Sequence, residues 1–196
     1  SIMIYIKDNF LEKNFLEIIN NHLNENEYKE TNVGDTNFYT QPSNKDFNEY
    51  IILKLEELEQ RKLVNILSFF RVSTDVLDAD WRIHSDLNVN GENPDRALVL
   101  YLSPSKRNDL NGTAFWEHNV YGKKLPLDIT DKEYDKTILI DSSDLNKWNL
   151  NSVVGYEKNR LVSYPANYFH SRYPDKGWEE GRQVYVMFYK FKDDEE

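Results

Sequence analysis

The chain has 196 residues, and its 34 Asp and Glu side chains outnumber its 24 Lys and Arg, which gives a formal net charge of −10. A duplex nucleic-acid binder needs a basic surface, so this charge argues against nucleic acid as a partner. The chain has no cysteine, which excludes disulfides, iron–sulfur clusters and cysteine-ligated zinc and favours a cytoplasmic protein. No apolar run approaches the roughly 18 residues of a membrane-spanning helix, so we expect no membrane association.

The N-terminal part, about residues 1–62, is expected to be mainly helical. A short strand over residues 3–6 precedes apolar residues at helical spacing, which predict an amphipathic helix over residues 10–23. Asn9 is expected to cap this helix, with Glu12 three residues later as its capping-box partner.

The polar residues 24–44 predict a loop that holds a single strand. A second helix is predicted from Lys45 to Arg61, because apolar residues recur there on one face. These residues are Phe47, Ile51, Leu55 and Leu58.

The pattern then changes to short strands separated by Gly, Pro, Asn and Asp. The predicted strands cover residues 66–72, 81–87, 97–102, 113–118, 159–164 and 184–191. We therefore expect a single domain of mainly β, α+β class, in which the N-terminal helices support a β core over about residues 63–191. A polar insertion over residues 119–158, with a helical signal around 143–154, interrupts the strands, and residues 192–196 form an acidic tail.

The motif with the clearest chemical content is His84-Ser85-Asp86. On a strand His84 and Asp86 would point to the same face, where an imidazole and a carboxylate can take two adjacent corners of a metal's coordination sphere. A His-x-acid match arises by chance roughly 0.7 times in a chain of this composition. Alone, the motif is therefore compatible with an ordinary hydrogen-bonded pair on a strand.

Two residues late in the chain raise the significance of that motif. His170 offers a third ligand, while His118 is interpreted as a strand-end histidine. Arg182 opens an apolar strand, where a cation is costly unless it meets an anion, and its planar fork suits a carboxylate. The set predicts a metal that a small dicarboxylate chelates at one end and Arg182 holds at the other. Arg172, two residues after His170, could face into the pocket and hold an acidic substrate, but a position outside the pocket is favoured.

With these residues the sequence resembles the Fe(II)/2-oxoglutarate-dependent dioxygenases, and among them the prolyl-hydroxylase-like branch. The resemblance covers about residues 66–191 and implies a double-stranded β-helix, of the jelly-roll or cupin-like kind, with the helices packed on one sheet. The segments that carry it are His84-Ser85-Asp86, Leu100-Tyr101-Leu102, Asn111-Gly112-Thr113-Ala114-Phe115-Trp116, Asn159-Arg160-Leu161-Val162, His170 and Gly181-Arg182.

The resemblance implies a role for each matched residue. His84, Asp86 and His170 would bind iron(II) and, with Arg182, form the catalytic set. Arg182 would hold the distal carboxylate of 2-oxoglutarate.

Three further residues are implied as contacts of the co-substrate. Tyr101 would reach the distal carboxylate, Thr113 would lie beside it, and Phe188 would form a bulky wall. Many members of the family have Ser or Thr two residues after the arginine, where this chain has Val184.

The implied activity is hydroxylation of an unactivated C–H bond with O2, which releases succinate and CO2 and is supported by ascorbate. The substrate would be a protein side chain, prolyl included, or a small metabolite. Two alternatives stay open at this point. One is a non-catalytic ligand-binding module on the same fold, and the other is a cupin-type metal enzyme that does not use 2-oxoglutarate.

Overall fold

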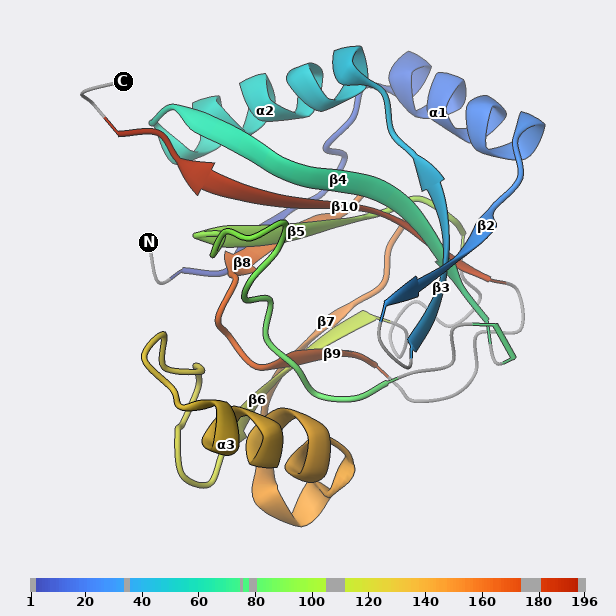
Figure 1. Cartoon of the computed structure of the whole chain (residues 1–196). Helices are drawn as coiled ribbons and strands as arrows, with labels where there is room; N and C mark the ends of the chain where they lie inside the picture. Colours follow the sequence, from blue (N-terminus) through green and yellow to red (C-terminus); the bar gives the residue numbers. More distant parts are fainter. Residues whose placement is uncertain are drawn as a thin grey trace.

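The computed structural model describes residues 3–33, 36–74, 76–77, 81–104, 112–173 and 181–193. Asn111 of the sequence motif and the last three residues of the predicted acidic tail lie outside these ranges. The described residues form two antiparallel sheets, and helices α1 and α2 cover the outer face of the larger one (Figure 1). The prediction of a mainly β protein is confirmed.

The larger sheet is built around the apolar C-terminal strand. Its seven strands lie in the order β1 (Tyr5–Lys7), β8 (Leu161–Pro165), β5 (Arg96–Tyr101), β10 (Arg182–Phe191), β4 (Leu63–Ser73), β3 (Thr36–Pro42) and β2 (Lys29–Val33). The smaller sheet has three strands in the order β7 (Trp148–Gly155), β6 (Gly112–His118) and β9 (His170–Tyr173). Strand β10 is therefore central, which explains its nearly continuous apolar sequence.

Helix α1 (Lys13–Glu25) begins later than the capping-box signal predicts. Glu12 is its N-cap and makes no side-chain capping bond, while Asn9 has a left-handed φ of 53°. The side chain of Asn159 instead holds this segment, because its Oδ1 accepts from Leu11 N and its Nδ2 donates to Leu11 O, both at 2.9 Å. This pairing keeps Leu11 buried ahead of the helix.

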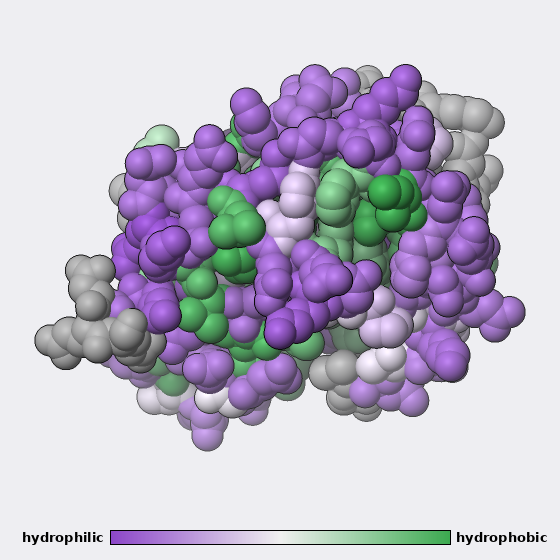
Figure 2. All heavy atoms as spheres, turned by 90° about the horizontal axis from the view of Figure 1, so that it is seen from above, coloured by the Kyte–Doolittle hydropathy of each residue, from purple (hydrophilic) through white to green (hydrophobic). Residues whose placement is uncertain are grey.

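Helix α2 (Lys45–Glu59) lies close to its predicted position. Asn44 caps its N-terminus by accepting from Phe47 N at 2.8 Å, and Gln60 ends it in a left-handed conformation. Apolar residues of both helices and of the outer face of the larger sheet form one buried cluster, which includes Ile19, Leu23, Ile51, Leu55, Phe70, Leu98, Tyr185 and Met187. The surface seen from above the helices is mostly hydrophilic (Figure 2). No described helix is both long and apolar enough to cross a membrane.

The segment over residues 24–44 contains two strands where the sequence predicts one. Strands β2 and β3 form an antiparallel hairpin that extends the larger sheet beyond β4. Pairing with β4, from Tyr39 opposite Val72 to Pro42 opposite Phe69, determines this structure. The hairpin is polar because it lies at the sheet edge, so its strands lack the apolar alternation that marks a half-buried strand.

The predicted insertion also differs from its sequence signal. Helix α3 (Asp131–Tyr134) continues into a π-type turn over Asp135–Ile140 and two short 3₁₀ turns. The helical signal around residues 143–154 is wrong, because residues 148–155 form β7 and pair with β6. Cross-strand pairing overrides the local pattern there, and only residues 119–147 project from the sheets.

A buried ion pair outside the site links α2 to three strands. Arg96 Nε lies 2.9 Å from Glu59 Oε1, with 0% and 2% of the two side chains exposed. Tyr189 OH donates to Glu59 at 3.0 Å, and Arg96 Nε donates to Ser163 Oγ at 3.2 Å. The ion pair is therefore buried away from water, and the Tyr189 and Ser163 hydroxyls supply its additional hydrogen bonds.

Glu59→Gln is expected to lower the free energy of unfolding by about 3–5 kcal/mol, because Arg96 would keep its buried charge without a counterion. Glu92→Gln is the control, since Glu92 pairs with Lys190 at 3.7 Å on the surface; we expect a change within about 0.5 kcal/mol. Urea denaturation of both variants measures the difference. Equal stability of the two variants would show that the buried pair does not stabilise the fold.

Candidate metal centre

The His-x-Asp motif does not lie on a continuous strand. Residues 81–87 make isolated backbone hydrogen bonds to separate segments and so do not pair continuously with a neighbouring strand. His84 and His170 exchange backbone hydrogen bonds, each at 2.9 Å, and Asp86 N donates to Ala166 O at 2.8 Å. The strand prediction for residues 81–87 is thus wrong, yet these contacts still place the His84 and Asp86 side chains together.

The three predicted ligands converge at this point. His170 Nε2 lies 3.1 Å from Asp86 Oδ2, and His84 Nε2 lies 3.7 Å from Asp86 Oδ1. One ligand atom from each of the three residues can be chosen so that all lie within 4.8 Å of one another.

Backbone carbonyls set the orientation of both imidazoles. His84 Nδ1 lies 3.0 Å from Arg82 O, and His170 Nδ1 lies 2.7 Å from Tyr168 O. A carbonyl can only accept, so each Nδ1 carries the hydrogen and each Nε2 is left to face Asp86. A histidine whose Nδ1 donates to a backbone carbonyl, so that Nε2 stays available, is typical of metal sites.

The charges of the cluster also suit a metal ion. Burial and the adjacent His170 lower the pKa of His84, which favours its neutral form. Burial opposes ionisation of Asp86, but His170, His84 and Arg71 together outweigh it, and the pKa of the carboxyl is lowered. Burial likewise opposes protonation of His170, and the Asp86 charge raises its pKa instead. Two imidazoles and one carboxylate are the donor set of non-haem iron(II) sites.

A second polar cluster surrounds Arg182 at the start of β10. Arg182 is 6% exposed, and its Nη2 donates to Gly112 O at 3.3 Å. The guanidinium carbon lies 5.4 Å from the ring centre of Tyr101 and 5.8 Å from that of Tyr156. Tyr101 OH and Thr113 Oγ1 are hydrogen-bonded at 2.7 Å. The structure thus places Arg182, Tyr101 and Thr113 in one buried group of donors.

Phe188 is not part of this group. It lies six residues along the same strand from Arg182, which corresponds to roughly 20 Å at 3.3–3.4 Å per residue. Its ring packs instead against Phe69, at 6.4 Å between centroids. The position of Phe188 therefore does not support its predicted contact with the co-substrate.

His118 lies at the end of β6, as expected for a strand-end histidine. It is buried, and its Nε2 lies 2.9 Å from Asp141 Oδ2. Trp148 Nε1 donates to Asp141 O at 2.8 Å. These contacts fasten the insertion to the smaller sheet and leave His118 outside the metal-binding group.

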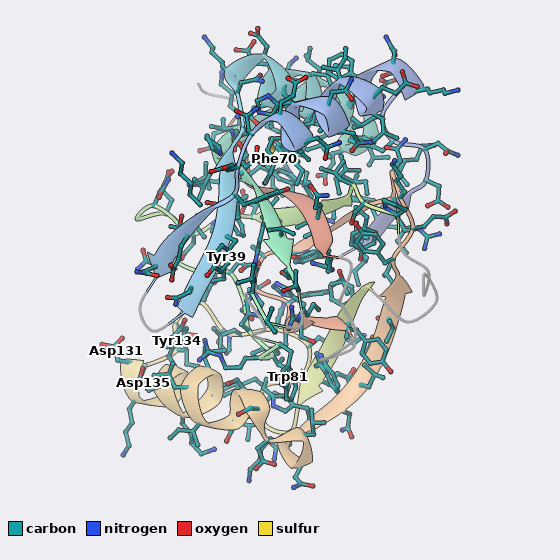
Figure 3. The ribbon with its side chains drawn as sticks, turned by 90° about the vertical axis from the view of Figure 1, so that its right-hand side faces the viewer. Tyr39, Phe70, Trp81, Asp131, Tyr134 and Asp135 are labelled. Atoms are coloured by element: carbon teal, nitrogen blue, oxygen red, sulfur yellow. The ribbon has the colours of Figure 1, made fainter. Side chains whose placement is uncertain are left out.

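Sequence reasoning missed two residues near the site. Tyr134 of α3 lies between that helix and the strands (Figure 3), and burial together with the Asp86 charge raises its pKa. Arg71 of β4 lies close enough for its positive charge to lower the pKa of Asp86 further. Tyr134 carries no local sequence signal, but Arg71 interrupts an apolar strand, much as Arg182 opens one.

No family model and no curated protein sequence matches the chain, so its similarity to known proteins is one of structure. The structure is similar to that of HygX from Streptomyces hygroscopicus with nickel, 2-oxoglutarate and hygromycin B bound, at 14% identity and a TM-score of 0.62, over 96% of this chain and 83% of that chain. The chain has the fold of iron- and 2-oxoglutarate-dependent enzymes.

Two other solved structures show the same similarity. The non-haem alpha-ketoglutarate-dependent epimerase SnoN from nogalamycin biosynthesis is 11% identical, with a TM-score of 0.63 over 96% of this chain and 78% of that chain. A prolyl-4-hydroxylase from Pseudomonas putida is 10% identical, with a TM-score of 0.55 over 97% and 93%. An epimerase and a prolyl hydroxylase match alike, so the fold does not select a branch of this group.

Proposed function

We propose that the protein is an Fe(II)- and 2-oxoglutarate-dependent oxygenase whose two sheets form a double-stranded β-helix. His84, Asp86 and His170 would hold the iron, and Arg182, Tyr101 and Thr113 would bind the distal carboxylate of 2-oxoglutarate. One observation carries the proposal: a convergent His-Asp-His group and a buried guanidinium with two hydroxyls occur in the same fold. A cupin-type enzyme without 2-oxoglutarate leaves the buried Arg182 unexplained, and a non-catalytic module is disfavoured because all three metal-binding residues and Arg182 are present.

Bound iron(II) would supply the oxidation chemistry, in which O2 and 2-oxoglutarate are consumed and succinate and CO2 are released. The contribution of the chain is geometric. The Arg82 and Tyr168 carbonyls orient the two imidazoles. Arg182 and Tyr101 would fix one end of the co-substrate.

The proposed reaction is hydroxylation of an unactivated C–H bond in a protein side chain, prolyl included, or in a small metabolite. The resemblance to the prolyl-hydroxylase-like branch supports the first, and a neighbour with hygromycin B bound supports the second. The absence of cysteine supports a cytoplasmic location.

The test is turnover of the co-substrate by the purified chain. With Fe(II), ascorbate, O2 and 2-oxoglutarate, we expect slow formation of succinate even without substrate, and none when iron or O2 is left out. Succinate is quantified by chromatography, and bound iron is measured after anaerobic reconstitution. Absence of bound iron would favour the ligand-binding module, and bound iron without any consumption of 2-oxoglutarate would favour the cupin-type enzyme.

A further inference from the structure

The insertion over residues 119–147 lies against the chain segments that carry the proposed metal ligands. Figure 1 shows α3 and the turns that follow it on the side of the smaller sheet that faces away from α1 and α2. Phe169 N, one residue before the ligand His170, donates to Lys123 O of the insertion at 3.0 Å. The insertion therefore supports the backbone that leads into one of the three ligands.

The insertion also contacts the segment that carries the other two ligands. Ile83 N, one residue before His84, donates to Ser142 O of the insertion at 3.2 Å. The backbone N–H groups of His84 and Asp86 donate instead to residues 166–170. Because this segment does not pair with a continuous strand, the Ser142 carbonyl is a direct constraint on where the segment begins.

Apolar side chains join the insertion to the same two segments. Ile83 and Phe169, each one residue before a histidine ligand, are both fully buried in one apolar cluster. Leu125 and Ile138 of the insertion and Trp148 of β7 complete that cluster. A closely packed interior transmits the displacement of one side chain to its neighbours. A displacement of the insertion is therefore expected to move both histidine-bearing segments.

Asp141 is the residue that fastens the insertion to the smaller sheet. Its Oδ2 accepts from His118 Nε2 at 2.9 Å and from Lys136 Nζ at 3.2 Å. Its carbonyl accepts from Trp148 Nε1 at 2.8 Å. Val120 N donates to His118 Nδ1 at 3.2 Å, so the ring hydrogen of His118 lies on Nε2 and is donated to Asp141. Asp141 thus links the end of β6 to the start of β7.

The charge of Asp141 strengthens these bonds. Burial opposes ionisation of its carboxyl, but His118 and Lys136 together outweigh burial and lower its pKa. Hydrogen bonds to an ionised acceptor are roughly twice as strong as those between neutral groups. Ser142, whose carbonyl accepts from Ile83, is the next residue in the same 3₁₀ turn, Asp141–Ser143. The position of this turn therefore depends directly on the Asp141 carboxylate.

We propose that Asp141 is a positioning residue for the metal centre. By fixing the 3₁₀ turn it sets the segment of His84 and Asp86 relative to His170, without being a ligand itself. This inference rests on the proposed function, because it assigns a further residue to the same metal site.

The test uses the full chain loaded with Co(II) in place of iron(II), because the visible absorption of Co(II) reports the number and arrangement of its ligands. Asp141→Leu removes the acceptor of both side-chain bonds and keeps a side chain of similar size. We expect it to weaken Co(II) binding about tenfold, the lower end of the loss for an outer partner of a metal ligand, and to change the visible bands at saturating Co(II). Asp141→Asn, whose amide oxygen still accepts from His118, should bind Co(II) about three- to fivefold more weakly than the native chain.

Glu59→Gln is the matched control. Glu59 is also a buried carboxylate in an ion pair, with Arg96, but it belongs to α2. This variant should have a lower Tm than the native chain, with Co(II) affinity and visible bands unchanged. Thermal unfolding of each metal-free variant measures its stability and establishes that it is folded.

The outcomes separate this inference from the proposed function. A native chain that binds no Co(II) contradicts both. Native Co(II) affinity and bands in Asp141→Leu contradict the positioning role alone. The same holds if Glu59→Gln changes affinity and bands as much as Asp141→Leu does, since the effect would then follow stability. Where Asp141→Leu does not fold, Asp141→Asn decides, and native affinity and bands in that variant overturn the positioning role.

Discussion

Replacing His84 or Asp86 by alanine is expected to abolish metal binding and 2-oxoglutarate turnover together. Each change removes one of three convergent ligands, whose donor atoms lie within 4.8 Å of one another. Loss of a mere outer partner of a metal ligand costs about 10- to 100-fold in metal affinity, so loss of a ligand should cost more than about 100-fold. Anaerobic iron titration and succinate formation measure the two effects.

Thermal unfolding provides an independent measurement of the same prediction. A metal present at about 100 times its dissociation constant stabilises the native state by about 2.7 kcal/mol, which for a chain of this size raises Tm by about 5–10 °C. We expect this shift with Mn(II) for the native sequence and none for the two alanine variants. His22→Gln is the control, since His22 contacts Asn26 on α1 and not the site. Retained iron and turnover in both alanine variants would contradict the metal assignment.

The cluster of candidate metal ligands could be predicted from sequence because residue type carries the signal. With no cysteine and four histidines, a metal site must use imidazole and carboxylate, and His84, Asp86 and His170 are brought together as expected. The structural reason given for the motif was wrong. Single contacts to His170 and Ala166, and not a strand ladder, orient His84 and Asp86. Residue type thus indicated the site although the local backbone was predicted incorrectly.

The errors in the fold share a different cause. The β2–β3 hairpin and β7 are polar or half-exposed strands whose structure depends on pairing with β4 and β6. Such pairing joins residues far apart in the chain, and no periodicity over a short window contains it. By contrast, α2 has an Asn44 cap and an apolar face in its own sequence, and its position was predicted closely.

The residues proposed to bind the co-substrate show how much can be predicted from sequence spacing. Tyr101 and Thr113 meet Arg182 because β5, β6 and β10 place them at one level of the fold. Phe188 shares a strand and a face with Arg182, but distance along the strand separates them. The alternation of residues along a strand shows which face a side chain points to. How far along the sheet that side chain lies relative to other strands depends on the register of strand pairing.

Arg182→Leu is expected to raise the KM for 2-oxoglutarate about 10- to 100-fold and leave metal affinity unchanged. The leucine removes a charged fork from a buried carboxylate site, and hydrogen bonds to charged groups contribute about 1.5–3 kcal/mol each. Arg182→Lys should fall between the native enzyme and Arg182→Leu, because an ammonium keeps the charge but not the two parallel donors. Initial rates of succinate formation at varied 2-oxoglutarate measure the effect.

Two neighbours make this test specific to the geometry of the site. Tyr101→Phe should raise the KM by no more than about tenfold, because it removes one neutral hydroxyl and leaves Thr113 in place. Phe188→Leu should leave the KM unchanged, since Phe188 packs on Phe69 at the far end of the strand. A larger effect from Phe188→Leu than from Arg182→Leu would mean that the co-substrate binds elsewhere between the sheets. An unchanged KM in Arg182→Leu would show that the buried Arg182 guanidinium of the native protein does not take part in 2-oxoglutarate binding.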